Sequence, residues 1–305
     1  MTERILILKL GATGDVVRTT PLLRVFTGEV TWITARENLA LLTGLDVRVH
    51  PLAWDQRERA LGVDYDLLIN LEDDSKVAEF ARSVRHHRLF GAHLDHAGEL
   101  TYTSDSHAWF DMSLISRFGR QKADALKLAN RASYQELLFG GLGLHFLGQR
   151  YALPATDASS LAGDVAIAPV AGPVWPMKGW DFYADLKAQL ESEGLRVNVL
   201  PRRQTLLEHV ADVRGHCCLV SGDSLPMHLA LGLGNRCVTI FNCTSPWEIF
   251  DYGLQRKLLS PLLEEFFYRR DLDPRATSAI PLERAIQAVL ECLSAGSATP
   301  GQPAP

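Results

Sequence analysis

The sequence predicts an α/β fold of two Rossmann-like, doubly wound domains that face each other across a cleft. Two observations support this: strand and helix signals alternate along both halves of the chain, and an apolar run breaks into a tight turn before a helix once in each half. The first break contains Asp15 and the second contains Asp223. Because ligands of open α/β sheets bind at the carboxyl ends of the strands, we expect a binding site at each break.

Length and composition indicate the broad class. A chain of 305 residues predicts two domains of ordinary size, and contents of 47% hydrophobic and 22% charged residues are typical of globular proteins. The net charge of −5 argues against a nucleic-acid partner. No apolar run reaches the roughly 18 residues that a membrane span needs. The five cysteines lack CxxC spacing, so we expect reduced thiols, no metal site and a cytoplasmic protein.

The first half shows a strand–helix rhythm that favours a parallel sheet. Strands are expected at residues 4–10, 30–34, 47–51, 66–71 and 88–91, and helices at 15–26, 36–42, 75–84 and 129–139. Pro21 requires a kink or break in the first helix. Residues 92–125 have no clear period, and we expect an irregular functional segment there. We expect the first domain to span residues 1–150.

The second half begins the same rhythm again. Strands are expected at residues 164–168, 196–200, 217–220 and 237–241, and helices at 180–193, 206–213, 226–233 and 282–293. We expect the second domain to span residues 151–293. Residues 294–305 are rich in Ala, Gly, Ser and Pro, which predicts a disordered tail.

The first break has the sequence Lys9-Leu10-Gly11-Ala12-Thr13-Gly14-Asp15. Its glycines let a ligand approach the backbone, but they form neither GxGxxG nor a Walker A loop, so a dinucleotide site is not indicated. At the start of a helix, the dipole keeps Asp15 ionised, and an ionised carboxylate at a cleft can act as a general base. The alternative is a plain N-cap aspartate.

The second break, Ser221-Gly222-Asp223-Ser224-Leu225-Pro226-Met227-His228, predicts an anion site. Asp223 or Ser224 would cap a helix that begins near Pro226, and its free N–H groups suit a diphosphate. His228 lies one turn into that helix, where the alternative is a packing role. Lys178 lies in the loop after the strand that ends at Ala168 and offers a charge to phosphate, unless it is a solvated loop lysine. The segment 242–248, with Thr244, would line the same rim.

Three segments together resemble glycosyltransferase family 9, the heptosyltransferases. They are "ILILKLGATGDVVRTTPLL" near the start, "WPMKGWDFYADL" around Lys178 and "LVSGDSLPMHLALGLGNRCVTIF" around Asp223. Their order and spacing agree with the family from residue 5 to about residue 253. The resemblance implies a GT-B fold and a metal-independent, inverting transfer of a sugar, without a cofactor. The donor would be a nucleoside-diphosphate sugar, ADP-heptose in this family, and the acceptor a lipopolysaccharide-core or related lipid-linked glycan.

The resemblance also implies roles for particular residues. Asp15 would deprotonate the acceptor hydroxyl, and Lys178 would contact the donor diphosphate. The other expected donor-binding residues are Asp223, Ser224, Leu225, His228 and Thr244. On the acceptor side we expect Gly14, Arg18, His107, Arg117 and Arg120. The enzyme would work in the cytoplasm, in peripheral contact with the inner face of the membrane, and its oligomeric state is left open.

Two departures from the family pattern leave alternatives open. Leu225 stands where the family has glycine. The acid that often meets the ribose after this strand in the family is not evident after Leu200, and the chain offers Arg202, Arg203 and Glu208 there instead. These departures allow another nucleotide-sugar as donor, or a non-catalytic nucleotide-sugar-binding protein on a decayed transferase scaffold. A Rossmann oxidoreductase is a third interpretation, but it lacks the GxGxxG fingerprint.

Overall fold

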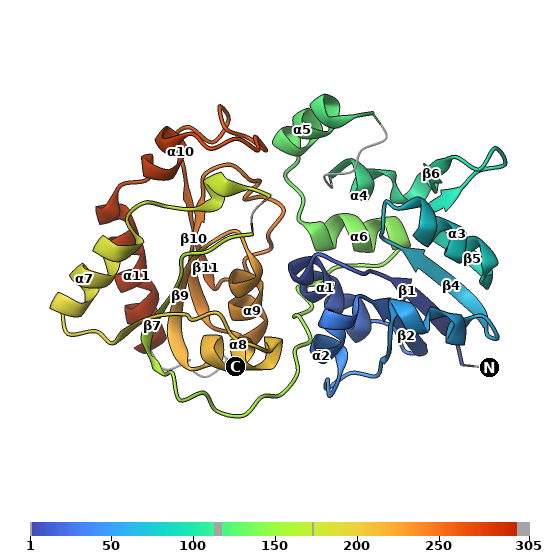
Figure 1. Cartoon of the computed structure of the whole chain (residues 1–305), viewed down its shortest axis with the longest axis horizontal. Coiled ribbons are helices and arrows are strands. Elements are labelled where there is room, and N and C mark those ends of the chain that lie inside the picture. The colour runs from blue at the N-terminus through green and yellow to red at the C-terminus, as the bar shows by residue number, and fades with distance from the viewer. Residues whose placement is uncertain (1, 113–117, 173, 298–305) are drawn as a thin grey trace, which may run out of the picture. The chain divides into compact units, whose positions relative to one another are not determined.

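The computed structural model describes residues 2–112, 118–172 and 174–297, and it divides into two compact units. The first unit comprises Met1–Ala155 together with Trp247–Phe250, and the second comprises Thr156–Pro246 and Asp251–Pro305 (Figure 1). Each unit is built on its own sheet. None of the described helices is long and apolar enough to cross a bilayer.

The first sheet has six strands in the order β3-β2-β1-β4-β5-β6. Neighbouring strands are parallel except β6, which pairs antiparallel with β5. The strands are β1 Arg4–Leu8, β2 Glu29–Thr34, β3 His50–Ala53, β4 Asp64–Asn70, β5 Arg85–Leu94 and β6 Leu100–Tyr102. The strand order reverses between β1 and β4, which makes the carboxyl ends of these two strands the place where an open α/β sheet binds ligands.

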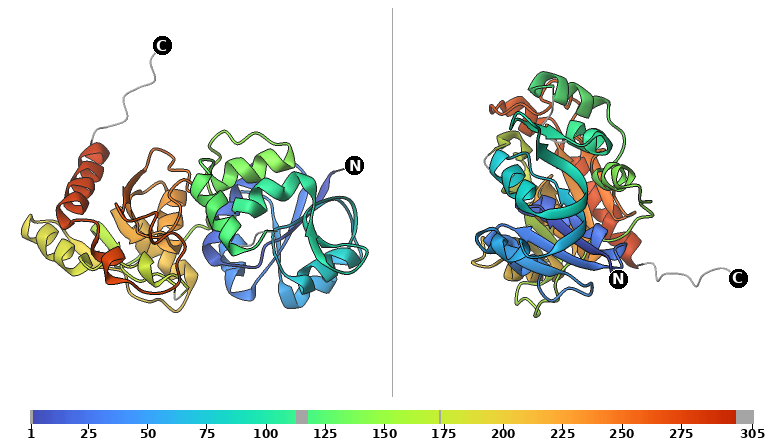
Figure 2. Two further views of the ribbon diagram at one scale, coloured as in Figure 1. Left: turned by 90° about the horizontal axis from the view of Figure 1, so that it is seen from above. Right: turned by 90° about the vertical axis from the view of Figure 1, so that its right-hand side faces the viewer.

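Both faces of this sheet are buried, as alternate side chains of β1 show. Ile5 and Ile7 belong to one apolar core and Leu6 and Leu8 to another on the opposite face, and all four are fully buried. Helices therefore cover both faces of the sheet (Figure 2). They are α1 Thr13–Thr19, α2 Leu39–Leu42, α3 Ser75–Ser83, α4 His107–Met112, α5 Arg120–Ala129 and α6 Tyr134–Leu142.

Three expectations for the first unit need correction. The helix expected at residues 15–26 ends at Thr19 and continues as a 3₁₀ turn, Thr20–Arg24, because Pro21 cannot donate a backbone hydrogen bond. Residues 92–125 were expected to be irregular, but their described part holds the end of β5, β6, α4 and the start of α5. The helix expected at 129–139 is instead the end of α5 and most of α6, which begins at a capping box of Ser133 and Glu136.

The second sheet has five parallel strands in the order β11-β10-β9-β7-β8, which reverses between β7 and β9. The strands are β7 Gly163–Ala168, β8 Val197–Val199, β9 His216–Gly222, β10 Arg236–Phe241 and β11 Gln255–Leu259. The helices are α7 Tyr183–Ser192, α8 Leu206–Arg214, α9 Leu225–Leu233, α10 Pro274–Ser278 and α11 Leu282–Ser297. Two parallel, helix-covered sheets confirm the predicted fold class.

The second unit also contains elements that the sequence did not predict. The edge strand β11 reads Gln-Arg-Lys-Leu-Leu, a polar pattern that does not resemble a buried parallel strand. The last helix was expected to end at residue 293, but α11 continues to Ser297. The remaining residues of the expected disordered tail, 298–305, lie outside the described part.

Candidate functional site

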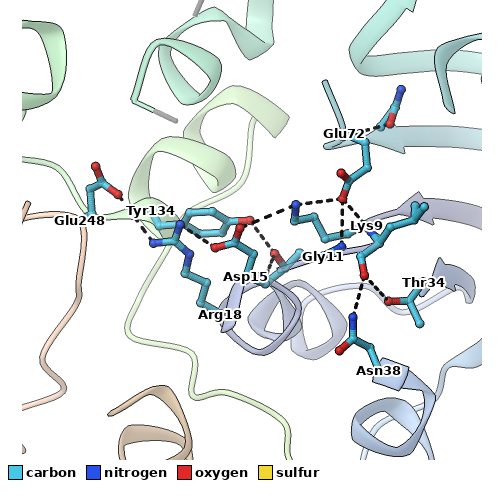
Figure 3. Close-up of polar contacts among 12 residues, drawn as sticks. Lys9, Gly11, Asp15, Arg18, Thr34, Asn38, Glu72, Tyr134 and Glu248 are labelled. Atoms are coloured by element: carbon cyan, nitrogen blue, oxygen red, sulfur yellow. Dashed lines mark hydrogen bonds and ion pairs between the residues drawn. The ribbon is translucent and has the colours of Figure 1, made fainter. Parts of the chain in front are cut away.

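The first candidate site lies at the carboxyl ends of β1 and β4, where the strand order reverses. Lys9 follows β1, and its ammonium nitrogen lies 2.9 Å from Oε1 of Glu72, which follows β4 (Figure 3). The same Glu72 oxygen accepts hydrogen bonds from the backbone N–H groups of Leu10, at 2.7 Å, and Gly11, at 3.3 Å. One partly buried carboxylate therefore fixes both the lysine and the backbone of the loop that leads into α1.

Asp15 is the third residue of α1, and 32% of its side chain is exposed. Its Oδ1 lies 2.8 Å from Nη2 of Arg18, and its Oδ2 lies 3.9 Å from Nζ of Lys9. The N-cap of α1 is Ala12, so the interpretation of Asp15 as a plain N-cap is wrong. Two neighbouring cations favour the ionised form of this carboxylate, which remains accessible to a ligand.

Arg18 connects Asp15 to the rest of the site. Its Nη1 lies 3.7 Å from Oε2 of Glu248, and its guanidinium stacks 4.1 Å from the ring centroid of Tyr134. Burial raises the pKa of the Tyr134 phenol, which therefore stays protonated, and its hydroxyl is 2.6 Å from Oγ1 of Thr19. Figure 3 shows Glu248, Arg18, Asp15, Lys9 and Glu72 as one row of alternating charge.

Sequence reasoning assigned no individual role to three residues of this row, Lys9, Glu72 and Glu248. It also assigned none to Tyr134, which stacks against Arg18. Lys9 lies near the end of the strand expected at residues 4–10, and Glu72 directly follows the strand expected at 66–71, so the adjacency of β1 and β4 is the signal that could have paired them. Glu248 was expected on the rim of the second domain, but residues 247–250 belong to the first unit. No local sequence pattern signals this long-range insertion.

The second candidate site lies at the carboxyl ends of β7 and β9, the corresponding position in the other sheet. Nζ of Lys178 lies 3.0 Å from Oδ2 of Asp223, and both side chains are mostly buried. Burial alone would raise the pKa of Asp223, but the charges of Lys178 and His228, with hydrogen bonds from Lys178 and Thr244, bring it to about 2. This carboxylate is anionic at any physiological pH and is occupied in holding the lysine.

The glycine before Asp223 explains how the lysine reaches it. A Cβ on Gly222 would lie 2.4 Å from the backbone oxygen of Lys178, so only glycine lets the two loops approach this closely. Asn242, which follows β10, donates a hydrogen bond of 2.7 Å to the backbone oxygen of Gly179. Three strand ends thus fix the loop that contains Lys178.

The start of α9 differs from the expected cap. Ser224 is the N-cap residue by position, but its hydroxyl donates to the backbone oxygen of Gly222, at 3.3 Å, and makes no side-chain cap. Leu225 and Pro226 open the helix, and Pro226 contributes no N–H. The expectation that Asp223 or Ser224 caps α9 through its side chain is wrong. The remaining N–H groups at this end are therefore not taken by a side-chain cap and can face an anion.

The other expected acceptor residues have diverse positions in the first unit. Gly14 lies in α1 next to Asp15, and His107 begins α4 with Nε2 3.3 Å from the backbone oxygen of Tyr102. Arg120 is exposed at the first position of α5. Arg117 lies outside the described residues.

Within the described ranges, no three His, Cys, Asp or Glu side chains gather in a way that could hold a metal ion.

Comparison with known proteins identifies the family resemblance. Residues 150–263 match the family model of glycosyltransferase family 9 (heptosyltransferase). No curated protein matches the chain in sequence. The resemblance to family 9 that the sequence motifs indicate is thereby confirmed over residues 150–263.

Solved structures show that the likeness of fold extends over the whole chain. A family 9 glycosyl transferase from Veillonella parvula has a TM-score of 0.65 at 15% identity, over 96% of this chain and 97% of that one. The E. coli heptosyltransferase WaaC with ADP has a TM-score of 0.63 at 18% identity, over 95% and 99%. The E. coli ADP-heptose lps heptosyltransferase II has a TM-score of 0.64 at 15% identity, over 97% and 100%.

Proposed function

We propose that this chain, a glycosyltransferase of the family 9 type, moves a heptose from ADP-heptose to a hydroxyl of a lipopolysaccharide-core or related glycan, with inversion and without a metal. The observation that carries the proposal is the partly exposed carboxylate of Asp15 at the reversal point of the first sheet. It lies between Lys9, at 3.9 Å, and Arg18, at 2.8 Å. A carboxylate in such a position can accept a proton from a bound alcohol.

In the proposed reaction, Asp15 takes the proton of the acceptor hydroxyl as its oxygen attacks the anomeric carbon of the donor. The new carbon–oxygen bond forms on the face opposite the diphosphate, and the bond to the diphosphate oxygen breaks. Nucleoside diphosphate leaves with the electron pair. A single in-line displacement of this kind reverses the configuration of the anomeric carbon.

The second unit would stabilise the negative charge that develops on the leaving diphosphate. Lys178 supplies a point charge, and the N–H groups at the start of α9 supply dipoles. Asp223 holds Lys178 at 3.0 Å and thereby limits the lysine's freedom before the donor binds. Ser224, Leu225, His228 and Thr244 are proposed to line the donor site around this pair.

The proposed donor and acceptor are those that the resemblance to family 9 implies. The E. coli heptosyltransferase WaaC, which has the same fold, was solved with ADP, and this supports ADP-heptose as the donor. On the acceptor side we propose Gly14, Arg18, His107 and Arg120, and the guanidinium groups of the two arginines suit the phosphates of a glycan core. The reaction is proposed to take place in the cytoplasm, against the inner face of the membrane.

A combined binding and transfer assay tests this function. Calorimetry with ADP, UDP and GDP should rank ADP first, because ligand binding to the second unit depends on the base as well as the diphosphate. Incubation of ADP-heptose with a heptose-deficient lipopolysaccharide core in the presence of EDTA should release ADP and form a new glycosidic bond. The NMR coupling of the transferred heptose should show the anomeric configuration opposite to that of the donor. Binding of ADP without transfer would refute the enzyme, and retained configuration would refute the single displacement.

A further inference from the structure

The segment Trp247–Phe250 brings a buried acid to the site of Asp15. We propose that Glu248 is a positioning residue, which shares the guanidinium of Arg18 with Asp15 and thereby keeps Asp15 basic enough to accept the acceptor's proton. The inference rests on the proposed function of Asp15 as the base and adds a residue that acts through another.

Arg18 has the geometry of a shared cation. Nη2 contacts Asp15 at 2.8 Å, and Nη1 lies 3.7 Å from Glu248. The ring of Tyr134 supports the guanidinium plane from 4.1 Å, and Gln135 donates a hydrogen bond of 3.0 Å to the backbone oxygen of Arg18. With the plane fixed in this way, the two carboxylates lie at different nitrogens of one guanidinium.

The position of Glu248 is fixed as firmly as that of Arg18. Its backbone oxygen accepts a hydrogen bond of 3.0 Å from the N–H of Tyr134, the first residue of α6. On one side, Trp247 lies under the guanidinium of Arg131, 3.8 Å from the ring centroid. On the other side, Phe250 packs edge-on against Phe146, with the ring centroids 4.9 Å apart. Only 8% of the Glu248 side chain is exposed, so its charge is little screened by water.

Charged groups lie on both sides of the guanidinium that Asp15 and Glu248 share. Lys9 and Arg18 are beside Asp15, and Lys127, with Asp124 and Arg120 near it, interacts with Glu248. Tyr134 is neutral, because burial raises its pKa. Lys9 is matched by Glu72 at 2.9 Å. Loss of the Glu248 charge would leave Asp15 as the carboxylate that faces Arg18 in this pair of contacts, and a less compensated positive charge makes a carboxylate a weaker base.

The experiment compares Glu248→Gln, which keeps the shape and removes the charge, with Asp46→Asn as a matched control. Asp46 pairs with Arg24 in the same unit at 3.1 Å, but at the surface. With ADP-heptose and a heptose-deficient lipopolysaccharide core, Glu248→Gln should lower kcat roughly three- to tenfold and leave the KM for the donor unchanged. In a plot of kcat against pH, the acid limb of Glu248→Gln should lie about half to one pH unit below that of the wild type. Glu248→Asp, which restores the charge, should restore part of kcat and return the limb toward its original pH.

A merely structural Glu248 gives a different result. In that case Glu248→Gln lowers the melting temperature, the acid limb stays at the wild-type pH, and kcat per folded molecule matches that of Asp46→Asn. This outcome overturns the inference.

A second measurement does not depend on turnover. The titration of the Asp15 carboxyl, followed by ¹³C NMR and assigned by the signal lost in Asp15→Asn, should have a lower midpoint in Glu248→Gln than in the wild type. An unchanged midpoint overturns the inference even if no acceptor is turned over.

Failure of the inference and failure of the proposed function can be told apart with Asp15→Asn in the transfer assay. If Asp15→Asn is inactive while Glu248→Gln matches the wild type in rate and pH profile, only the inference is wrong. If Asp15→Asn transfers heptose normally, the proposed base is wrong, and the inference that depends on it is also overturned.

Discussion

The two units place an aspartate and a lysine at the same point of two similar sheets, but the aspartates have different surroundings. In the first unit, Lys9 is 2.9 Å from Glu72 and only 3.9 Å from Asp15, whose carboxylate is partly exposed and pairs with Arg18. In the second unit, no ion pair between Lys178 and a second acid is recorded among the described residues, and Lys178 pairs directly with Asp223 at 3.0 Å. An additional glutamate after β4 is therefore what leaves one aspartate available to a ligand.

This difference suggests separate tasks for the two sites. A carboxylate that is accessible and flanked by cations suits proton transfer, and a lysine held by a buried carboxylate suits the binding of an anion. The predictions below alter one site or the other, and each should change one property and leave the other intact.

The largest effect is expected for Asp15→Asn. The amide cannot accept the acceptor's proton, and a general base contributes roughly 10²- to 10⁴-fold, so kcat should fall by at least about a hundredfold. The dissociation constant of ADP, measured by calorimetry, should stay within about twofold of the wild type, since the second unit is unchanged. The surface variant Asp46→Asn is the control. A matching loss of ADP affinity would show that the two sites do not have separate tasks.

The second effect concerns the stability of the first unit at alkaline pH. Burial lowers the pKa of Lys127 to about 8 from its ordinary 10.5, although the charges of Glu248 and Asp124 oppose this. Between these pH values the unfolded lysine binds a proton that the folded lysine does not, so the free energy of unfolding should rise with pH, by at most about 3 kcal/mol. Lys127→Met should be more stable at pH 7 and lack this rise. Urea unfolding at pH 7, 9 and 10.5 measures the free energy of unfolding of the wild type and of Lys127→Met. If this free energy changes with pH in the same way in both proteins, the account is contradicted.

The second unit should respond at the opposite end of the pH scale. The folded pKa of Asp223 is about 2, below its ordinary 3.8, so its stabilising contribution is complete above pH 3.8 and is lost as the pH falls through 2. The difference corresponds to about 2 kcal/mol. Asp223→Asn should lose this stability at pH 7 and show a shallower decline between pH 4 and pH 2. The comparison fails if Asp223→Asn and the wild type lose stability in parallel over that range.

The smallest effect is expected for Lys178→Met. Loss of one charge-assisted contact to the diphosphate should weaken ADP binding by about tenfold. Lys187→Met is the matched control, because Lys187 pairs with Glu191 on α7, away from the strand ends. Saturating donor should not restore kcat fully in Lys178→Met, because the lysine is also proposed to stabilise the charge that develops on the leaving diphosphate. Unchanged ADP affinity would remove Lys178 from the donor site.

The sequence predicted the parts of the fold that local patterns encode. The apolar run of β1 and the glycine-rich break after it located Asp15, and the corresponding pattern located Asp223, because a buried parallel strand and its turn have a strong local signal. The charged strand β11 and the polar helix α5 were missed, since an edge strand and a half-exposed helix are not distinguished by hydrophobic pattern alone.

The site was only partly predictable for a different reason. Arg18 was expected on the acceptor side, but its contact with Glu248 joins residues 230 positions apart, and no periodicity reports such a contact. Glu72 was more predictable than Glu248. It directly follows a predicted strand, and the order β1-β4 of a doubly wound sheet would have placed it beside Lys9. The side-chain cap expected at Ser224 was wrong because its hydroxyl bonds to Gly222 instead.

The most direct test of the division of tasks is single-turnover transfer by Asp15→Asn with ADP-heptose bound at saturation. The account predicts that donor binding reaches the wild-type amplitude while heptose transfer to the core acceptor slows by at least about a hundredfold. Transfer at the wild-type rate from the fully bound donor would contradict it.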